Sequence, residues 1–98
     1  MNIQQHNPPH PGAFIRRVYM DPFDLGSNAV AKKLQVSAST FNRLLNEKSS
    51  VSSEMALKLS KVLGRSPESW MLMQDYYDLH RAKSRVDLRK YKPIRFDE

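Results

Sequence analysis

The stretch SNAVAKKLQVSASTFNRLLN, residues 27–46, contains two short helical patterns that meet at Ser37. Apolar residues recur in both patterns at the spacing of an amphipathic helix with one buried face. The residues expected to face the core are Val30, Ala31, Leu34, Phe41, Leu44 and Leu45. Ser37 is a suitable N-cap for the second helix, and Val36 is an apolar anchor for the tight turn before it. We therefore predict a helix-turn-helix in preference to an ordinary surface hairpin, which has no need of this apolar set.

The second helix of this motif leaves small and polar side chains facing outward. Such residues at the start of an exposed helix, followed by an arginine one turn later, suit the major groove of DNA. The residues predicted to contact bases are Ala38, Ser39, Asn42 and Arg43. The residues predicted to contact phosphates, and so to position the helix, are Ser27, Asn28, Lys32, Ser37, Thr40 and Lys48. Arg43 suits a bidentate contact with guanine, and Asn42 one with adenine.

The composition restricts the class of protein. A chain of 98 residues has room for one domain, and its net charge of +6 favours a polyanionic partner. The chain has no cysteine, which excludes disulfides and thiolate metal sites. No apolar run approaches the roughly 20 residues that span a bilayer, and the first residues lack the pattern of a signal peptide. We expect a soluble cytoplasmic protein without a membrane partner.

The N-terminal third contains one further helix. Residues 1–10 are polar and rich in proline, and we expect them to form a flexible arm. A helix is predicted from Pro11, whose missing N–H is not needed in a first turn. Asp21 precedes a proline and is expected to end this helix, since a residue in that position is disfavoured in the helical region. Two apolar loop residues, Phe23 and Leu25, are expected to pack this helix against the helix-turn-helix.

Two more helices are predicted after the motif. Ser52 caps the first of them, and Gly64 is expected to end it in the left-handed conformation. Ser66 caps the second, which covers residues 67–83 and carries apolar residues on two sides. The stripe Trp70, Met73 and Tyr77 is expected to close the core. The stripe Leu72, Tyr76 and Leu79 then needs a second surface, and a symmetric dimer is the economical answer.

The remaining features give little support to catalysis or to a cofactor. The three histidines, His6, His10 and His80, are not spaced as metal ligands, and no nucleophile with a matching base is evident. We expect solvent-facing or capping histidines, no enzyme activity, no metal and no cofactor. Residues 84–98 form a basic tail, which is either a solvated segment or an arm that contacts phosphates or a partner.

A series of motifs runs along most of the chain. They are His10-Pro11-Gly12, Val36-Ser37, Arg43-Leu44-Leu45-Asn46, Ser52 with Glu54-Met55-Ala56, Leu63-Gly64 with Ser66-Pro67-Glu68 and Trp70, and Gln74 with Tyr77-Asp78-Leu79. With this series the chain, from His10 to about Lys83, resembles the HigA (VapI-like) family of antitoxins, which are helix-turn-helix proteins of the XRE type from bacterial toxin–antitoxin modules.

The resemblance implies an all-α, five-helix lambda-repressor-like domain over residues 11–83, between the flexible arm and the basic tail. It further implies a homodimer that represses its own operon at a palindromic operator in double-stranded DNA. The same protein would neutralise a co-encoded RelE-like (HigB-type) ribonuclease toxin. Two alternatives stay open: a stand-alone repressor without a toxin, and a protein-interaction module that does not bind DNA.

The chain departs from the family pattern where glycine is usual. Gln35 stands before Val36, and Glu47 stands after Asn46. If the backbone needs a positive φ in the second position, Asn46 adopts it at a smaller cost than Glu47.

Overall fold

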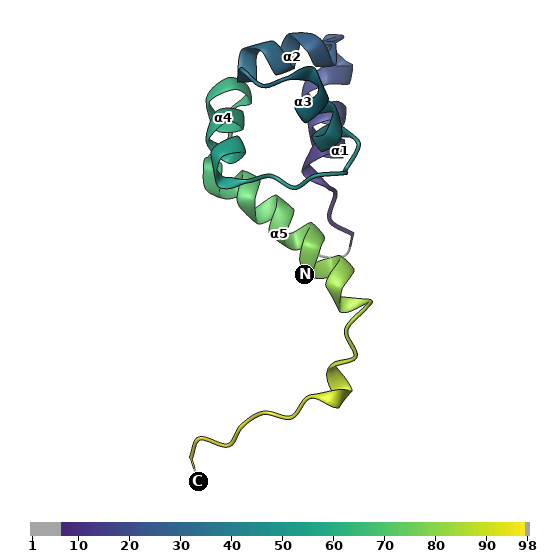
Figure 1. Cartoon of the computed structure of the whole chain (residues 1–98), viewed down its shortest axis with the longest axis vertical. Helices are drawn as coiled ribbons and strands as arrows, with labels where there is room; N and C mark the ends of the chain where they lie inside the picture. The colour runs from purple at the N-terminus through teal and green to yellow at the C-terminus, as the bar shows by residue number, and fades with distance from the viewer. Residues whose placement is uncertain (1–6, 98) are drawn as a thin grey trace.

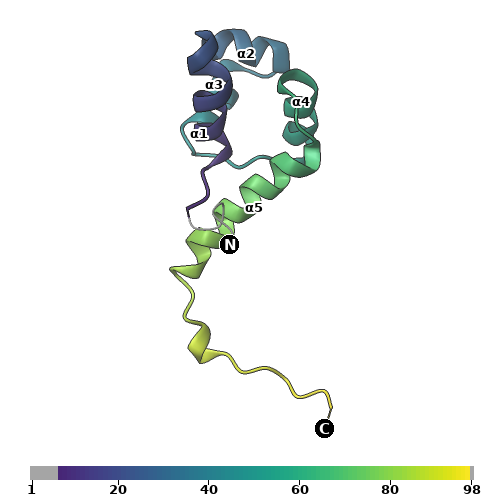
Figure 2. The same cartoon turned by 180° about the vertical axis from the view of Figure 1, so that it is seen from behind.

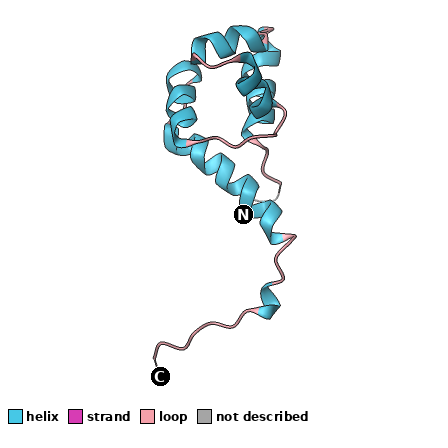
Figure 3. Ribbon diagram, viewed as in Figure 1, coloured by secondary structure: helices cyan, strands magenta, loops and turns pink. Residues whose placement is uncertain are grey.

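The computed structural model describes residues 7–97, and within this range the secondary structure is entirely helical (Figures 1 and 3). The five α-helices are α1 (Pro11–Ile15), α2 (Ser27–Leu34), α3 (Ala38–Leu45), α4 (Ser53–Leu63) and α5 (Pro67–Lys83). The five-helix all-α fold predicted from the sequence is confirmed. No helix among the described residues is both long and apolar enough to cross a membrane.

The helix-turn-helix has the predicted core. Its buried residues are Val30, Ala31 and Leu34 on α2, and Phe41, Leu44 and Leu45 on α3. The half-buried Val36 packs against this core from the turn. Ser37 is the N-cap of α3, and its Oγ accepts a hydrogen bond from the Thr40 backbone N–H at 3.0 Å. The motif therefore forms as the local signals predict, because apolar spacing and cap agree.

The first helix does not end where the sequence suggested. After α1 the chain continues as a π-helix, η2 (Arg16–Met20), and then as a 3₁₀-helix, η3 (Asp21–Phe23). Asp21 keeps helical angles, φ −59° and ψ −47°, so the prediction that it leaves the helical region was wrong. Residues five apart lie about 140° from each other on an α-helix. The wider π-turn brings Ile15 and Met20 to the same buried face.

The loop residues expected to pack α1 against the motif do not do so. Phe23 is 68% exposed and Leu25 is 43% exposed, so that prediction was wrong. Met20, which is 5% exposed, is the residue from this part of the chain that joins the core. Asp24 then ends the helical run in the left-handed conformation, with φ 54°.

Helix α1 crosses α3 at backbone distance. A Cβ built on Gly12 would lie 2.0 Å from the Leu44 carbonyl oxygen, so no side chain fits at this position. His10 is the N-cap of α1 and is buried, and Pro8 is buried as well. The packed part of the chain therefore begins before the predicted boundary at residue 11. Residues 1–6 of the predicted flexible arm lie outside the described residues.

Helices α4 and α5 close the other side of the domain. Ser52 and Ser66 cap them as predicted, and α5 has the predicted bounds. Gly64 ends α4 with a positive φ of 104°, as predicted, but its ψ of −170° lies outside the left-handed α region; Arg65, the next residue, also has a positive φ, of 67°. Trp70 is fully buried at the centre of the domain, and its Nε1–H donates to the Gly64 carbonyl at 2.9 Å.

The C-terminal tail leaves the domain. Helix α5 ends at Lys83, and the following residues, including the 3₁₀-helix η4 (Leu88–Lys90), extend away from the other helices (Figure 2). The principal extents of 58 × 26 × 23 Å reflect this projection. Residues 83–97 are all exposed, so the tail makes little contact with the core of its own chain.

Candidate nucleic-acid interface

The outward face of α3 presents three of the four predicted base-contacting residues to solvent. Ala38, Ser39 and Arg43 are exposed, whereas Asn42 is half-buried. Arg43 bends back toward the loop after the helix, where its Nη2 donates to the Lys48 carbonyl at 3.2 Å. A contact between Arg43 and a base edge thus requires this exposed hydrogen bond to open, which costs about 0.5–1.5 kcal/mol.

The end of α3 explains the unusual backbone of the following loop. The Lys48 N–H donates to the Arg43 carbonyl at 2.8 Å, and the Glu47 N–H donates to the Leu44 carbonyl at 3.0 Å. This pair of bonds is the Schellman motif, which requires positive φ at the residue after the C-cap. That residue is Glu47, with φ 62°, while the C-cap Asn46 has φ −89°. The positive φ thus falls on Glu47, the residue for which it costs more, and not on Asn46.

The turn between α2 and α3 uses the same device. The Val36 N–H donates to the Ala31 carbonyl, and the Gln35 N–H donates to the Lys32 carbonyl, both at 3.1 Å. Gln35 adopts φ 58° and ψ 43°, the conformation for which glycine is preferred. The motif also brings Val36 against the buried Ala31 side of the helix, as the hydrophobic contact of a Schellman cap does.

The predicted phosphate-contacting residues come from α2, from the start of α3 and from the loop after α3. Ser27 and Asn28 open α2, whose N-cap Gly26 offers no side-chain acceptor, so the first N–H groups of this helix have no capping partner. The exposed members of the set are Asn28, Lys32, Ser37, Thr40 and Lys48; Ser27 is half-buried. Helix N-termini and lysines both suit phosphate groups.

Within this set Ser37 and Thr40 differ in what they can still donate. The Ser37 hydroxyl donates to the Thr40 Oγ1 at 2.9 Å while accepting the Thr40 N–H. Its only hydroxyl hydrogen is therefore used within the chain, whereas the Thr40 hydroxyl hydrogen stays available. Thr40 is the better donor to an anion of the two.

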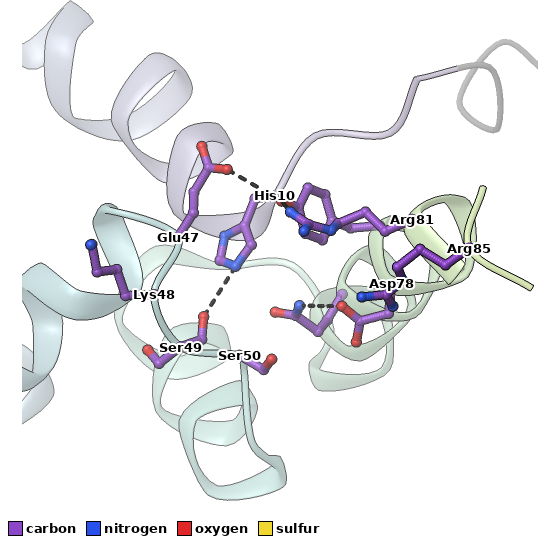
Figure 4. A pocket seen from close by; sticks show the side chains of 10 residues that line it. His10, Glu47, Lys48, Ser49, Ser50, Asp78, Arg81 and Arg85 are labelled. Carbon is purple, nitrogen blue, oxygen red and sulfur yellow. Dashed lines mark hydrogen bonds between the residues drawn. The ribbon is translucent and has the colours of Figure 1, made fainter. Parts of the chain in front are cut away.

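Sequence reasoning missed a polar cluster that supports the loop after α3 (Figure 4). The His10 Nδ1 accepts the Gly12 N–H at 2.9 Å, and its Nε2 lies 3.0 Å from the Ser49 carbonyl, to which it donates as the neutral Nε2–H tautomer. The ring also packs edge-on against Tyr77, with centroids 4.9 Å apart. Burial lowers the pKa of His10, which favours this neutral form.

Gln74 completes the support from α5. It is 4% exposed; its Oε1 accepts the Val51 N–H at 2.8 Å, and its Nε2 donates to Asp78 at 3.1 Å. Glu47, Lys48, His10 and Gln74 line the same open pocket of about 330 Å³. A buried glutamine within an apolar helix pattern is the signal that identifies such a residue, because it must satisfy a backbone group. Among residues 7–97, no buried side-chain nitrogen or oxygen lacks a partner.

The two stripes of α5 face in different directions. Trp70 is buried and Met73 packs against the core, as predicted for the first stripe, while Tyr77 is half-buried. The predicted dimer stripe is Leu72, Tyr76 and Leu79. In this stripe Leu72 is 48% exposed and Leu79 is 56% exposed, and Tyr76 is half-buried. Its role in a dimer stays a prediction.

Comparison with known proteins agrees with this geometry. A family model described as helix-turn-helix matches residues 27–70. Virulence-associated protein I of Dichelobacter nodosus is 38% identical over 74 residues, which are 76% of this chain and 68% of the relative.

Two solved structures are similar over most of the chain. One is an addiction module antidote protein of the HigA family from Coxiella burnetii, with 31% identity, a TM-score of 0.80, and coverage of 90% of this chain and 99% of that one. The other is Pseudomonas aeruginosa antitoxin HigA with the higBA promoter, with 31% identity, a TM-score of 0.80, and coverage of 92% and 98%. The chain therefore belongs to the HigA-type (VapI-like) family of helix-turn-helix, DNA-binding antitoxins.

Proposed function

We propose that this chain represses its own operon as a homodimer bound to a palindromic operator, and that it neutralises a co-encoded RelE-like (HigB-type) toxin. The observation that carries the DNA-binding part is the exposed face of α3, with Ala38, Ser39 and Arg43 on a helix fixed at both ends by Ser37 and the Schellman motif. The net charge of +6 adds a general attraction to DNA. The HigA antitoxin of Pseudomonas aeruginosa, solved with promoter DNA, supports the same role.

The proposed contacts divide by chemistry. Arg43 reads a guanine edge and Asn42 an adenine edge, each worth about 1–3 kcal/mol of discrimination, while Ala38 and Ser39 fit close to the bases. The phosphate contacts are Ser27, Asn28, Lys32, Ser37, Thr40 and Lys48, and of the two hydroxyls at the start of α3 only that of Thr40 keeps a free donor. The backbone carbonyl of Lys48 accepts the hydrogen bond from Arg43. The proposed phosphate contact at Lys48 and the proposed base contact at Arg43 are therefore linked through this bond.

The proposed dimer forms through Leu72, Tyr76 and Leu79 on α5. Two copies set two recognition helices about 34 Å apart, which is one turn of the duplex, and a palindromic operator follows from the two-fold symmetry. A single helix-turn-helix buries too small an interface for useful specificity, so the dimer is required for repression.

The DNA-binding part is tested by footprinting the full chain on the region upstream of its own gene. We expect a protected palindrome, with half-sites about 10 base pairs apart, and binding at least about 10³-fold tighter than to a shuffled duplex of equal composition. Equal affinity for the two duplexes would instead favour a protein-interaction module.

The toxin-binding part is tested by co-expression with the neighbouring reading frame. We expect a small basic protein that co-purifies with this chain and that arrests growth when expressed without it. Sequence-specific DNA binding without such a protein would identify a stand-alone repressor.

A further inference from the structure

The C-terminal tail carries large apolar side chains that the chain itself does not cover. Their exposed fractions lie between 45% and 89%, values typical of isolated surface groups. The residues are Val86, Leu88, Tyr91, Ile94 and Phe96. Five such side chains within eleven residues, on a segment that extends from the domain, indicate a sequence adapted to a surface elsewhere.

Three of the apolar grooves formed by residues 7–97 differ in the charge of their walls. The groove between α1, α5 and the residues before α1 carries Arg17 and Arg65, and the groove between α2 and α4 carries Lys33. The groove between α4 and α5, of about 540 Å³, carries Glu68 and Asp75 and no basic residue. Its apolar lining includes Ala56, Leu57, Met71 and Leu72. We call it the α4–α5 groove.

The charges of the tail select this groove. The tail is basic, and neither Lys90 nor Lys92 takes part in an ion pair among residues 7–97. Glu68 and Asp75 are likewise without an ion pair in the described part of the chain. These carboxylates lie seven residues apart on α5, about 10 Å along its axis, within reach of two lysines that flank one residue. The basic walls of the other two grooves would repel the same segment.

The backbone conformation of the tail suits a segment that lies in a groove. After η4 the chain is extended at Tyr91, with φ −109° and ψ 138°. In an extended segment neighbouring side chains point to opposite sides. Tyr91 and Lys92 follow η4, so Tyr91 faces the apolar floor when Lys92 faces a carboxylate on the rim, and Lys90 lies next to them at the end of η4.

We propose that residues 88–97 of one copy dock in the α4–α5 groove of a second copy of this chain. The groove lies at the N-terminal half of α5, whereas the tail leaves from the C-terminal end of this helix and runs away from the groove (Figures 1 and 2). Leu72 belongs both to the groove and to the proposed dimer stripe, so the groove adjoins the surface on which we propose the partner. This inference rests on the proposed homodimer and adds a reciprocal exchange of tails to it.

The test uses charge reversal in the full-length chain, followed by sedimentation to measure the dissociation constant of the dimer. The groove variant is Glu68→Lys with Asp75→Lys, and the tail variant is Lys90→Glu with Lys92→Glu. Each is expected to raise the dissociation constant about tenfold or more, since each dimer has two docked tails whose attraction becomes repulsion. Lys33→Glu with Lys61→Glu changes two exposed residues that do not line the groove; it is the matched control for the tail variant and should leave the constant unchanged.

Mixing the two variants distinguishes docking on a partner from docking on the same chain. An equimolar mixture forms heterodimers in which basic tail meets acidic groove and acidic tail meets basic groove, so tight association returns. All four changes in one chain should restore it too. Rescue in the single chain without rescue in the mixture would overturn the proposal in favour of a tail that folds back on its own domain.

The remaining outcomes separate this inference from the proposed function. A parent dimer whose dissociation constant is the same in both variants overturns tail docking and leaves the dimer through α5 intact. A parent chain that is monomeric at micromolar concentration overturns both. Circular dichroism of each variant shows whether the fold is retained, and rescue in the mixture shows it independently.

Discussion

Replacing Gly12 by alanine is expected to destabilise the domain through a single methyl group. The Cβ would lie 2.0 Å from the Leu44 carbonyl oxygen, 2.9 Å from its carbon and 3.0 Å from the Leu45 Cα. Ordinary contact begins near 3.4 Å, so α1 and α3 would have to separate by more than 1 Å. All three atoms belong to the backbone of α3, so no rotamer change relieves the clash.

The magnitude follows from the groups involved. Overpacking of a close-packed core costs typically about 1–3 kcal/mol, and the rigid neighbours here place the cost at the upper end. The better helix propensity of alanine returns about 0.8–1 kcal/mol at most. We expect a net loss of about 2 kcal/mol, or roughly 8–16 °C in Tm for a chain of this size.

Urea unfolding provides the measurement, with Trp70 as the reporter because it is the only tryptophan and is fully buried. Gly26→Ala is the matched control, since a Cβ there has no atom within 4 Å and the backbone has an ordinary φ of −83°. The control should lose less than about 1 kcal/mol, the value of a weakened N-cap. If Gly12→Ala is as stable as Gly26→Ala, the close approach of α1 and α3 is not a determinant of the fold.

Three further predictions concern the interface and its support. Arg43→Ala should weaken binding to the operator by about 1–3 kcal/mol per half-site and binding to random DNA far less. Lys48→Ala should weaken binding to the operator and to random DNA alike, and should flatten the salt dependence by ~0.9 per lost phosphate. DNA titrations at several salt concentrations measure the two effects, and equal losses on the two DNAs for Arg43→Ala would remove it from the base contacts. Gln35→Gly should raise the free energy of unfolding in urea by about 0.5–1 kcal/mol. The left-handed conformation costs a residue with a side chain about 1–2 kcal/mol, and part of this gain is lost because glycine increases the entropy of the unfolded chain. A variant that is less stable than the parent chain would contradict this. Because the pKa of His10 is lowered on folding, its contribution to the free energy of unfolding should be fully present above about pH 6.5. This free energy should fall as the pH drops below that value, by at most about 1.4 kcal/mol per pH unit. His10→Asn, which keeps a capping acceptor, should lack this fall when it and the parent chain are unfolded at the same series of pH values.

Local signals were sufficient for the regular part of the fold. The caps at Ser37, Ser52 and Ser66 each accept the backbone N–H three residues later, as their sequence context predicts. Apolar spacing identified the buried faces of α2 and α3, and with them the outward face of the recognition helix. These signals act over one or two helical turns, so they can be read without knowing the rest of the chain.

Contacts between segments far apart in the chain decided the features of the fold that local signals did not predict. The π-turn accompanies the burial of Met20 while Phe23 and Leu25 stay exposed, and which of these residues is buried depends on where the other helices lie. The same holds for the buried His10 and Gln74, which satisfy the backbone of residues 39 and 23 positions away in the chain. Glu47 accepts a positive φ because the hydrogen bonds that end α3 leave no alternative position for it.

The sequence by itself therefore determined the helices, their caps and the polar outward face of α3, because these follow from periodicity and short-range hydrogen bonds. Tertiary structure alone decided where α1 bends, how closely it approaches α3, and which polar groups are buried behind the recognition helix. These features depend on the balance of packing and hydrogen bonding between segments far apart in the chain, and no local pattern contains that balance.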